Sequence, residues 1–359
     1  MSEPPGLPDG PIDVPRILRP SYPETPSDAG PPAGFAHEQS QPSVWRPGHP
    51  GPDRPWLRRP DSGSEQPSAP FAAAGHPAFE ARADDPLVNH PTAGFDGWFS
   101  KLVTTLRRSW RSLLIVVTVG VALPEAPAGI AMDIQRQRFL HQLALHPRPE
   151  GLPAGVLADA LFGLGVVLAL TLVGGFFSAA GWAAGIWALT EEAATGRPAA
   201  AGRALRYGLR RAARLWLWGL VAAPIVVAGF VACVLPGIYL ALAVSLYSFV
   251  VVFERGRNPI GGTFRLTHKF FGAAAGRTAV LVAVCVGYSL VVDVIVGLGG
   301  ALVALAGADA FLVVGATNLV QSLLQAPATA LLLAGLLLTY AELRAREVPL
   351  TTADLRSQL

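Results

Sequence analysis

The stretch CVLPGIYLALAVSLYSFVVVFERGRNPIGGTFRLTHKFF, from Cys233 to Phe271, contains the pattern that decides the fold. One apolar run ends at Leu235-Pro236-Gly237, and a second run, from Ile238 to Val252, follows at once. This second run stops at Glu254, and a basic amphipathic segment comes next. Apolar runs of this kind are typical of membrane-spanning helices. We therefore predict a membrane hairpin with a tight Pro-Gly turn on one side of the bilayer and a basic interfacial helix on the other.

The composition of the 359-residue chain favours the same class of protein. The chain is 51% hydrophobic and 15% charged, whereas soluble domains carry about a quarter charged residues. Its apolar residues are concentrated after residue 95, and its arginines cluster at the ends of the apolar runs. This arrangement follows the positive-inside rule, and no nucleic-acid recognition module is visible. We therefore expect membrane lipids as partners and no nucleic acid.

Residues 1–93 have a different composition, with about two-thirds of the chain's 32 prolines. Such a segment cannot bury enough apolar surface to offset its chain entropy, so we predict a disordered, Pro-rich cytoplasmic tail. Trp45 and Trp56 lie in short islands that are candidate docking motifs for a protein partner. Isolated tryptophans in a solvated tail are the simpler interpretation. No signal-peptide pattern opens the sequence, so we expect the first spanning helix to direct insertion.

Six apolar segments predict an all-α, six-span integral membrane protein with a transmembrane domain at 94–347. The spans are predicted at about 110–130, 160–189, 215–234, 238–253, 278–304 and 311–340, before a short, frayed tail at 348–359. Residues 95–111 predict an amphipathic helix lying on the membrane before the first span. Pro124 and Pro127 predict that this span kinks or ends near Leu123. Gly181-x-x-x-Gly185 provides a small-residue face, for packing within the chain or for dimerisation.

The charges of the connecting segments predict the orientation of the spans. The N-terminal flank, the 190–214 and 254–277 connectors and the C-terminal flank are Arg-rich, whereas the turns at 235–237 and 306–310 have almost no positive charge. These segments alternate along the chain, so both termini are predicted to be cytoplasmic. Lysine is nearly absent while arginine and alanine are abundant, which favours a bacterial origin and hence a plasma membrane.

The common catalytic signatures do not occur in the sequence. It contains no HExxH, CxxC, Walker A or GxSxG pattern, so we expect no catalytic residue, metal site or cofactor. Cys233 and Cys285 lie in different apolar runs, and we expect two unpaired, buried thiols rather than a disulfide.

Polar side chains at membrane depth form the first candidate site, because they are costly there unless they have a role. Asp293 lies in the fifth span, and Asn318, Gln321 and Gln325 lie at helical spacing on the sixth. Consecutive spans are antiparallel neighbours, so these groups are expected to meet. Two interpretations stay open: a hydrogen-bonded clamp between the two helices, and an ion, proton or headgroup path.

Basic residues at the predicted cytoplasmic face form the second candidate site. Positive-inside anchoring explains them, and a site for anionic lipid headgroups is the alternative. This predicted collar consists of Arg210, Arg211, Arg214, Arg265, Lys269 and Arg277. Glu254, at the end of the fourth span, is expected to pair with one of these arginines and to fix the connector that follows.

Three segments together resemble a known family: Leu235-Pro236-Gly237-Ile238, Val251-Val252-Phe253-Glu254-Arg255 and Thr263-Phe264-Arg265-Leu266-Thr267. They resemble the multi-pass membrane domain attached to some bacterial glycerophosphoryl diester phosphodiesterases, which also occurs as stand-alone membrane proteins. The resemblance covers roughly residues 95–347. In the fused proteins a separate soluble barrel carries the catalytic residues, and only about 15 residues follow the last span here. The resemblance therefore implies the membrane architecture and no catalytic residue.

These observations together favour a non-catalytic membrane module that associates with lipid or with envelope proteins. A small transporter or channel that uses the polar face between the fifth and sixth spans is the alternative. An enzyme acting within the membrane is the third hypothesis.

Overall fold

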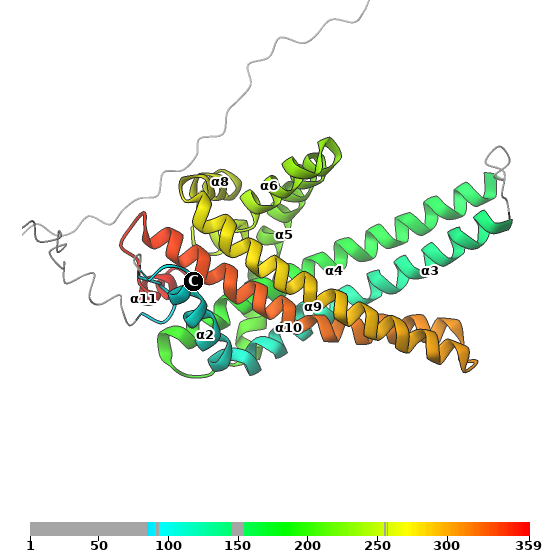
Figure 1. Ribbon diagram of the computed structural model, residues 1–359, viewed down its shortest axis with the longest axis horizontal. Helices are drawn as coiled ribbons and strands as arrows, with labels where there is room; N and C mark the ends of the chain where they lie inside the picture. Colours follow the sequence, from blue (N-terminus) through cyan, green and yellow to red (C-terminus); the bar gives the residue numbers. More distant parts are fainter. Residues whose placement is uncertain (1–84, 91–92, 146–153, 255, 257) are drawn as a thin grey trace, which may run out of the picture. The chain divides into compact units, whose positions relative to one another are not determined.

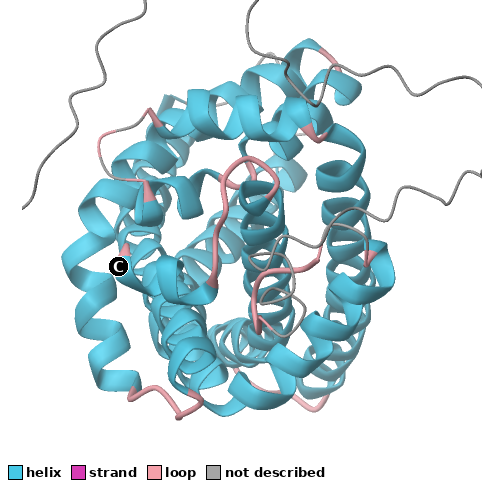
Figure 2. Ribbon diagram, turned by 90° about the vertical axis from the view of Figure 1, so that its left-hand side faces the viewer, coloured by secondary structure: helices cyan, strands magenta, loops and turns pink. Residues whose placement is uncertain are grey.

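The computed structural model describes residues 85–90, 93–145, 154–254, 256 and 258–359. Within these ranges every regular element is a helix (Figure 2). The helices are α2 (Gly94–Val117), the π-helix η2 (Thr118–Ala122), α3 (Leu123–Leu145), α4 (Ala154–Thr195), α5 (Ala201–Ala232), α6 (Val234–Val244), α7 (Tyr247–Phe253), α8 (Pro259–Lys269), α9 (Phe271–Leu305), α10 (Ala310–Ala345) and α11 (Thr352–Ser357). The predicted disordered tail lies outside the described residues, apart from the short segment just before α2.

The predicted all-α membrane fold with six spans is confirmed. Six described helical segments are long and apolar enough to cross a bilayer, namely Gly94–Leu145, Gly155–Thr195, Ala201–Ala232, Val234–Phe253, Phe271–Leu305 and Ala310–Ala345. Large apolar side chains on their outer faces are exposed, among them Phe162 at 74% and Leu290 at 60%. Exposure of this kind is what a lipid-facing surface requires, because lipid tails are as apolar as the side chains.

The spans are organised as helical hairpins (Figure 1). α3 packs on α4, α5 on both α4 and α6, and α9 on α10. Figure 1 shows the α3–α4 and α9–α10 hairpins extending in the same direction, while the α5–α6 hairpin leans away from them. The ends of the described chain meet at the base of these hairpins, since the Thr352 hydroxyl donates to Asp85 Oδ1 at 2.5 Å.

The first span does not end near Leu123, as its prolines predicted. The helix continues from α2 through η2 into α3 and ends at Leu145. Pro124 and Pro127 lie within this continuous helix without ending it, and the wider π turn at Thr118–Ala122 changes the helical register just before them. The segment predicted as a polar connector from residue 133 is therefore helical up to Leu145.

The amphipathic start of α2 packs on protein rather than lying on the membrane alone. Trp98 and Leu102 are 1% and 3% exposed, within the main hydrophobic core. Phe95 and Phe99 on the neighbouring face remain exposed. The predicted amphipathic helix is thus present, but part of its apolar face packs against α10 instead of lying on the membrane.

The turn of the α5–α6 hairpin lies at Cys233 rather than at Pro236 and Gly237. Cys233 is extended, with φ −175° and ψ 154°, between the last residue of α5 and the first of α6. Pro236 is tolerated in the first turn of α6, where its missing N–H costs little. Gly237 allows close contact with α5, because a Cβ there would lie 2.9 Å from Phe230 Cα.

The helix after this turn is interrupted, which brings the basic helix closer than predicted. α6 ends at Val244, and α7 begins at Tyr247. α8 forms as predicted, but it contacts both α6 and α7. The Tyr239 hydroxyl of α6 lies 2.9 Å from His268 Nδ1 of α8. The prediction put the Pro-Gly segment and the basic helix on opposite sides of a straight span, whereas the break between α6 and α7 brings α6 into contact with α8.

The C-terminal residues are ordered by local and tertiary contacts, so the prediction of a frayed tail is wrong. Thr351 and Asp354 form a reciprocal capping box at the start of α11. Leu355 is fully buried in the main core. This helix was missed because its six residues carry too short a pattern to show periodicity.

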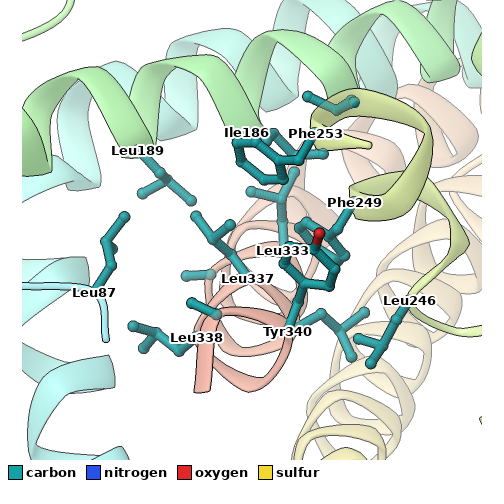
Figure 3. Packing of buried hydrophobic residues seen from close by; sticks show 14 of the residues in the cluster. Leu87, Ile186, Leu189, Leu246, Phe249, Phe253, Leu333, Leu337, Leu338 and Tyr340 are labelled. Carbon is teal, nitrogen blue, oxygen red and sulfur yellow. The ribbon is translucent and has the colours of Figure 1, made fainter. Parts of the chain in front are cut away.

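The main hydrophobic core lies where α4, α7 and α10 meet (Figure 3). The Tyr340 ring stacks on Phe249 and on Phe253, each with centroids 5.7 Å apart. Leu333 and Leu337, which point into the same cluster, are fully buried. Aromatic pairs of this geometry contribute about 0.5–1.5 kcal/mol beyond their buried area.

We predict that Gly181→Ala destabilises the protein, because Gly181 sits directly on the backbone of η2. A Cβ at Gly181 would lie 2.6 Å from the carbonyl carbon of Gly120, which cannot move without shifting the helix. Overpacking of this kind costs about 1–3 kcal/mol. Gly165→Ala is the control on the same helix, since a Cβ there meets nothing within 4 Å. Thermal unfolding in detergent measures both, and equal melting temperatures would contradict the prediction.

Candidate functional site

A buried ion pair lies at the base of the hairpins. Arg277 Nη2 of α9 is 2.7 Å from Glu342 Oε1 of α10, with side chains 5% and 0% exposed. Asn89 Nδ2 donates to Glu342 Oε2 at 3.1 Å, and Arg346 Nη2 donates to Oε1 at 2.7 Å. Arg277 also donates to the carbonyl oxygen of Gly94 at 3.3 Å. Arg277 was predicted to lie in the basic collar, as an interfacial anchor or as part of a headgroup site, but its burial and these contacts give it a structural role instead.

Arg265 and Lys269 of the predicted collar lie around a shared carboxylate, Glu347. Their side-chain nitrogens are each 3.4 Å from it, and both cations are about half exposed. Partial burial pushes the pKa of Glu347 upward, but Arg265 and Lys269, with a hydrogen bond from Arg344, outweigh burial and hold the pKa below its ordinary value of 4.5. Glu347 is therefore ionised at neutral pH and ties α8 to the end of α10.

The remaining predicted collar residues lie together on α5. Arg210 is exposed, and Arg211 and Arg214 are half-buried. Arg211 Nη2 donates to the Leu359 carbonyl oxygen at 3.2 Å and lies 5.7 Å from the centre of the Tyr207 ring. The six basic residues predicted as one collar thus lie in three different environments. Arg277 is buried, Arg265 and Lys269 surround Glu347, and the other three lie along α5.

Glu254 fixes the end of α7, as predicted, but its partner is different. Arg344 Nε of α10 is 3.4 Å from Glu254 Oε1, and the Tyr340 hydroxyl donates to the same oxygen at 3.1 Å. The carboxylate therefore anchors α7 to α10 rather than to the predicted basic collar.

Polar side chains at membrane depth meet along the α9–α10 hairpin, as predicted. Gln321 Nε2 donates to Asp293 Oδ1 at 2.9 Å, and the Ser289 hydroxyl donates to Gln325 Oε1 at 2.9 Å. Asn318 Nδ2 instead donates to Asp133 Oδ2 of α3, also at 2.9 Å. These bonds link three helices, and each predicted polar residue has a partner.

Sequence reasoning missed Ser289 and Asp133. Ser289 lies one helical turn before Asp293, so the spacing alone would have placed both side chains on the same face of the helix. Asp133 was assigned to a polar connector because the first span was predicted to end too early. Asp293 itself is exposed and Gln321 half-buried, so this pair lies at the outer surface of the hairpin.

A cavity of about 720 Å³ opens where the α5–α6 hairpin leans away from its neighbours. α4, α5, α6, α9 and α10 contribute to its walls, which are mostly apolar. Ligand pockets in proteins have volumes of about 300–1,000 Å³ and a few placed polar groups. The polar or aromatic lining here includes Ser178, Trp182, Trp216, Ser245, Tyr247 and Thr278. No sequence pattern identified this cavity.

The part of the chain that the structure describes contains neither a cluster of metal-binding side chains nor a disulfide. No three His, Cys, Asp or Glu side chains among these residues lie close enough to hold a metal ion. Cys233 is exposed and Cys285 half-buried, and both are free thiols. The exposure of Cys233 corrects the expectation that both thiols are buried.

Comparison with known proteins adds no assignment, since no family model, curated protein or solved structure matches this chain.

We predict that Arg277→Met destabilises the protein by about 3 kcal/mol, because it leaves the Glu342 charge buried without its closest cross-helix partner. Arg277→Met combined with Glu342→Leu should recover part of this loss, since a buried ion pair is often replaced by apolar residues without penalty, while Asn89 and Arg346 lose their acceptor on Glu342. Arg210→Met is the control, because Arg210 is exposed. Thermal unfolding of the four proteins in one detergent tests this. A double variant as unstable as the single one would contradict it.

Proposed function

We propose that this multi-pass membrane protein is a non-catalytic module that associates with lipid, and that the cavity of about 720 Å³ receives an acyl chain. The apolar cavity among candidate spans is the observation that carries the proposal. Inside a bilayer, lipid tails are the most abundant ligand of this chemistry. Hydroxyl and indole groups in the walls suit the glycerol or headgroup end of a lipid better than an ionic substrate.

The origin of the lining residues also supports an acyl chain as the occupant. Leu172 and Leu220 come from α4 and α5, while Thr278 and Leu336 come from α9 and α10. The lining therefore draws on helices that belong to different hairpins. A flexible chain fits such a seam between hairpins, because it can follow the gap without requiring matched polar groups.

The resemblance to the membrane domain of bacterial glycerophosphoryl diester phosphodiesterases supports the same proposal. Its motifs include Pro236 and Gly237, which lie in the first turn of α6, and Glu254, which anchors α7. We propose on the same basis that the protein resides in a bacterial plasma membrane with both termini cytoplasmic. The Pro-rich segment 1–93 would then face a cytoplasmic protein partner.

Transport along the α9–α10 hairpin is the alternative function. The exposed Asp293 favours it, because an ionisable group at membrane depth commonly serves a proton or ion path. Against it, the polar side chains bond to one another in pairs. Such pairing is typical of a clamp between helices, so we place lipid association first.

We predict that Ala241→Phe reduces lipid retention, because Ala241 lines the cavity and a phenyl ring would fill part of it. The measurement is native mass spectrometry of protein released from lipid nanodiscs, counting the lipids that remain bound. Wild type should retain at least one lipid that the variant loses. Val234→Phe is the matched control on α6, since Val234 is 62% exposed and is not among the cavity-lining residues. Equal retention by wild type and both variants would contradict the proposal.

A further inference from the structure

A second, polar cavity of about 470 Å³ lies at the opposite end of α4 from the α3–α4 connector. The end of α4, the start of α5 and α11 form its walls. Its lining differs from that of the apolar cavity, because guanidinium and carboxylate groups dominate it. The charged or polar members are Glu191, Thr195, Arg197, Arg203 and Arg356.

The loop that forms one wall is held in place by a buried carboxylate. Glu192 is 2% exposed, and its Oε1 accepts from the Ala199 N–H at 2.7 Å and from the Ser112 hydroxyl at 2.6 Å. Gly196, with φ +67°, ends α4 in the left-handed conformation. The loop between α4 and α5 is therefore tied both to α4 and to α2, so Arg197 projects from a fixed backbone.

The charges in this cavity do not balance. Arg356 donates from Nε and Nη2 to both oxygens of Glu191, at 2.8 and 2.9 Å, so these two residues neutralise each other. Arg197 and Arg203 are exposed, and no ion pair between residues that the structure describes includes either of them. Two positive charges thus face the same polar cavity without a carboxylate of their own.

The start of α5 adds to this positive environment. Ala200, the N-cap residue, provides no acidic or other side-chain acceptor, and the Arg203 N–H donates to the Ala200 carbonyl oxygen at 2.9 Å, so the positive end of the helix dipole is not offset by a side chain there. The two guanidinium groups supply the hydrogen-bond donors of the cavity, and planar guanidinium groups match the oxygens of a phosphate. The set therefore favours an oxyanion over a cation or an apolar ligand.

We propose that this cavity binds a phosphate group, with Arg197 and Arg203 as its main ligands. The phosphate belongs either to an anionic lipid headgroup or to a small soluble molecule, and both share the recognised chemistry. The site uses none of the residues predicted earlier as a basic collar. It also does not depend on an acyl chain in the apolar cavity, so either proposal can fail alone.

The first test measures inorganic phosphate. The melting temperature of the full-length protein in detergent is followed against phosphate concentration, with chloride added to hold ionic strength constant. A bound ligand raises the melting temperature, and above the dissociation constant the rise continues with the logarithm of the ligand concentration. Arg197→Gln combined with Arg203→Gln should weaken apparent phosphate affinity by about tenfold or more, because two charge-assisted donors are lost. Arg107→Gln combined with Arg206→Gln removes the same charge from exposed positions outside the cavity and should leave affinity unchanged.

The second test distinguishes the sources of the phosphate. Protein in nanodiscs of mixed phosphatidylcholine and phosphatidylglycerol is released, and retained phosphatidylglycerol is counted by native mass spectrometry. Loss of this lipid only from the Arg197/Arg203 variant identifies a headgroup site. Phosphate binding that depends on these arginines without lipid retention identifies a soluble ligand. If neither ligand responds to Arg197 and Arg203 more than to Arg107 and Arg206, the proposed site is overturned.

Discussion

The ion pair between Arg277 and Glu342 is the constraint on which the base of the structure depends. Both side chains are almost completely buried, and charges in such a place are tolerated only when they are paired and hydrogen-bonded. Glu342 meets this condition by accepting from Asn89 as well as from the two arginines. One carboxylate thus joins the segment before α2, the start of α9 and the end of α10. Trp98 covers the pair, with its ring centre 5.9 Å from the Arg277 guanidinium carbon.

This polar base explains how exposed hairpins coexist with a well-packed core. The buried aromatic stack around Tyr340 lies next to the polar base, and packing there is dense. Beyond it the hairpins contact one another less, and their apolar side chains are exposed for lipid to cover. The apolar cavity lies where the α5–α6 hairpin leans away, and the polar cavity lies at the base. A lipid-associated function fits this division, because headgroups and acyl chains would meet different parts of one protein.

The parts of this structure that sequence predicted are those governed by local pattern. Long apolar runs gave the six spans, and helical spacing placed Gln321 and Gln325 on a face that meets α9. Features that depend on distant partners were not predictable in this way. The π turn at Thr118–Ala122 changes a register that periodicity assumes to be constant, and Arg277 looked like any interfacial arginine until Glu342 was placed beside it. The apolar cavity is lined by helices that are distant in sequence, and the polar cavity is lined mainly by residues 191–203 but depends on distant Arg356, which neutralises Glu191.

The most direct test of this account is the labelling of single cysteines by a membrane-impermeant maleimide. Both native cysteines are first replaced, and a cysteine is then introduced at exposed Ala308, in the α9–α10 turn, or at exposed Ser357, in α11. With six spans and the proposed cytoplasmic termini, these two positions lie on opposite sides of the bilayer. We predict labelling of A308C in intact cells and of S357C only after permeabilisation. Labelling of both variants from the same side would contradict the six-span arrangement.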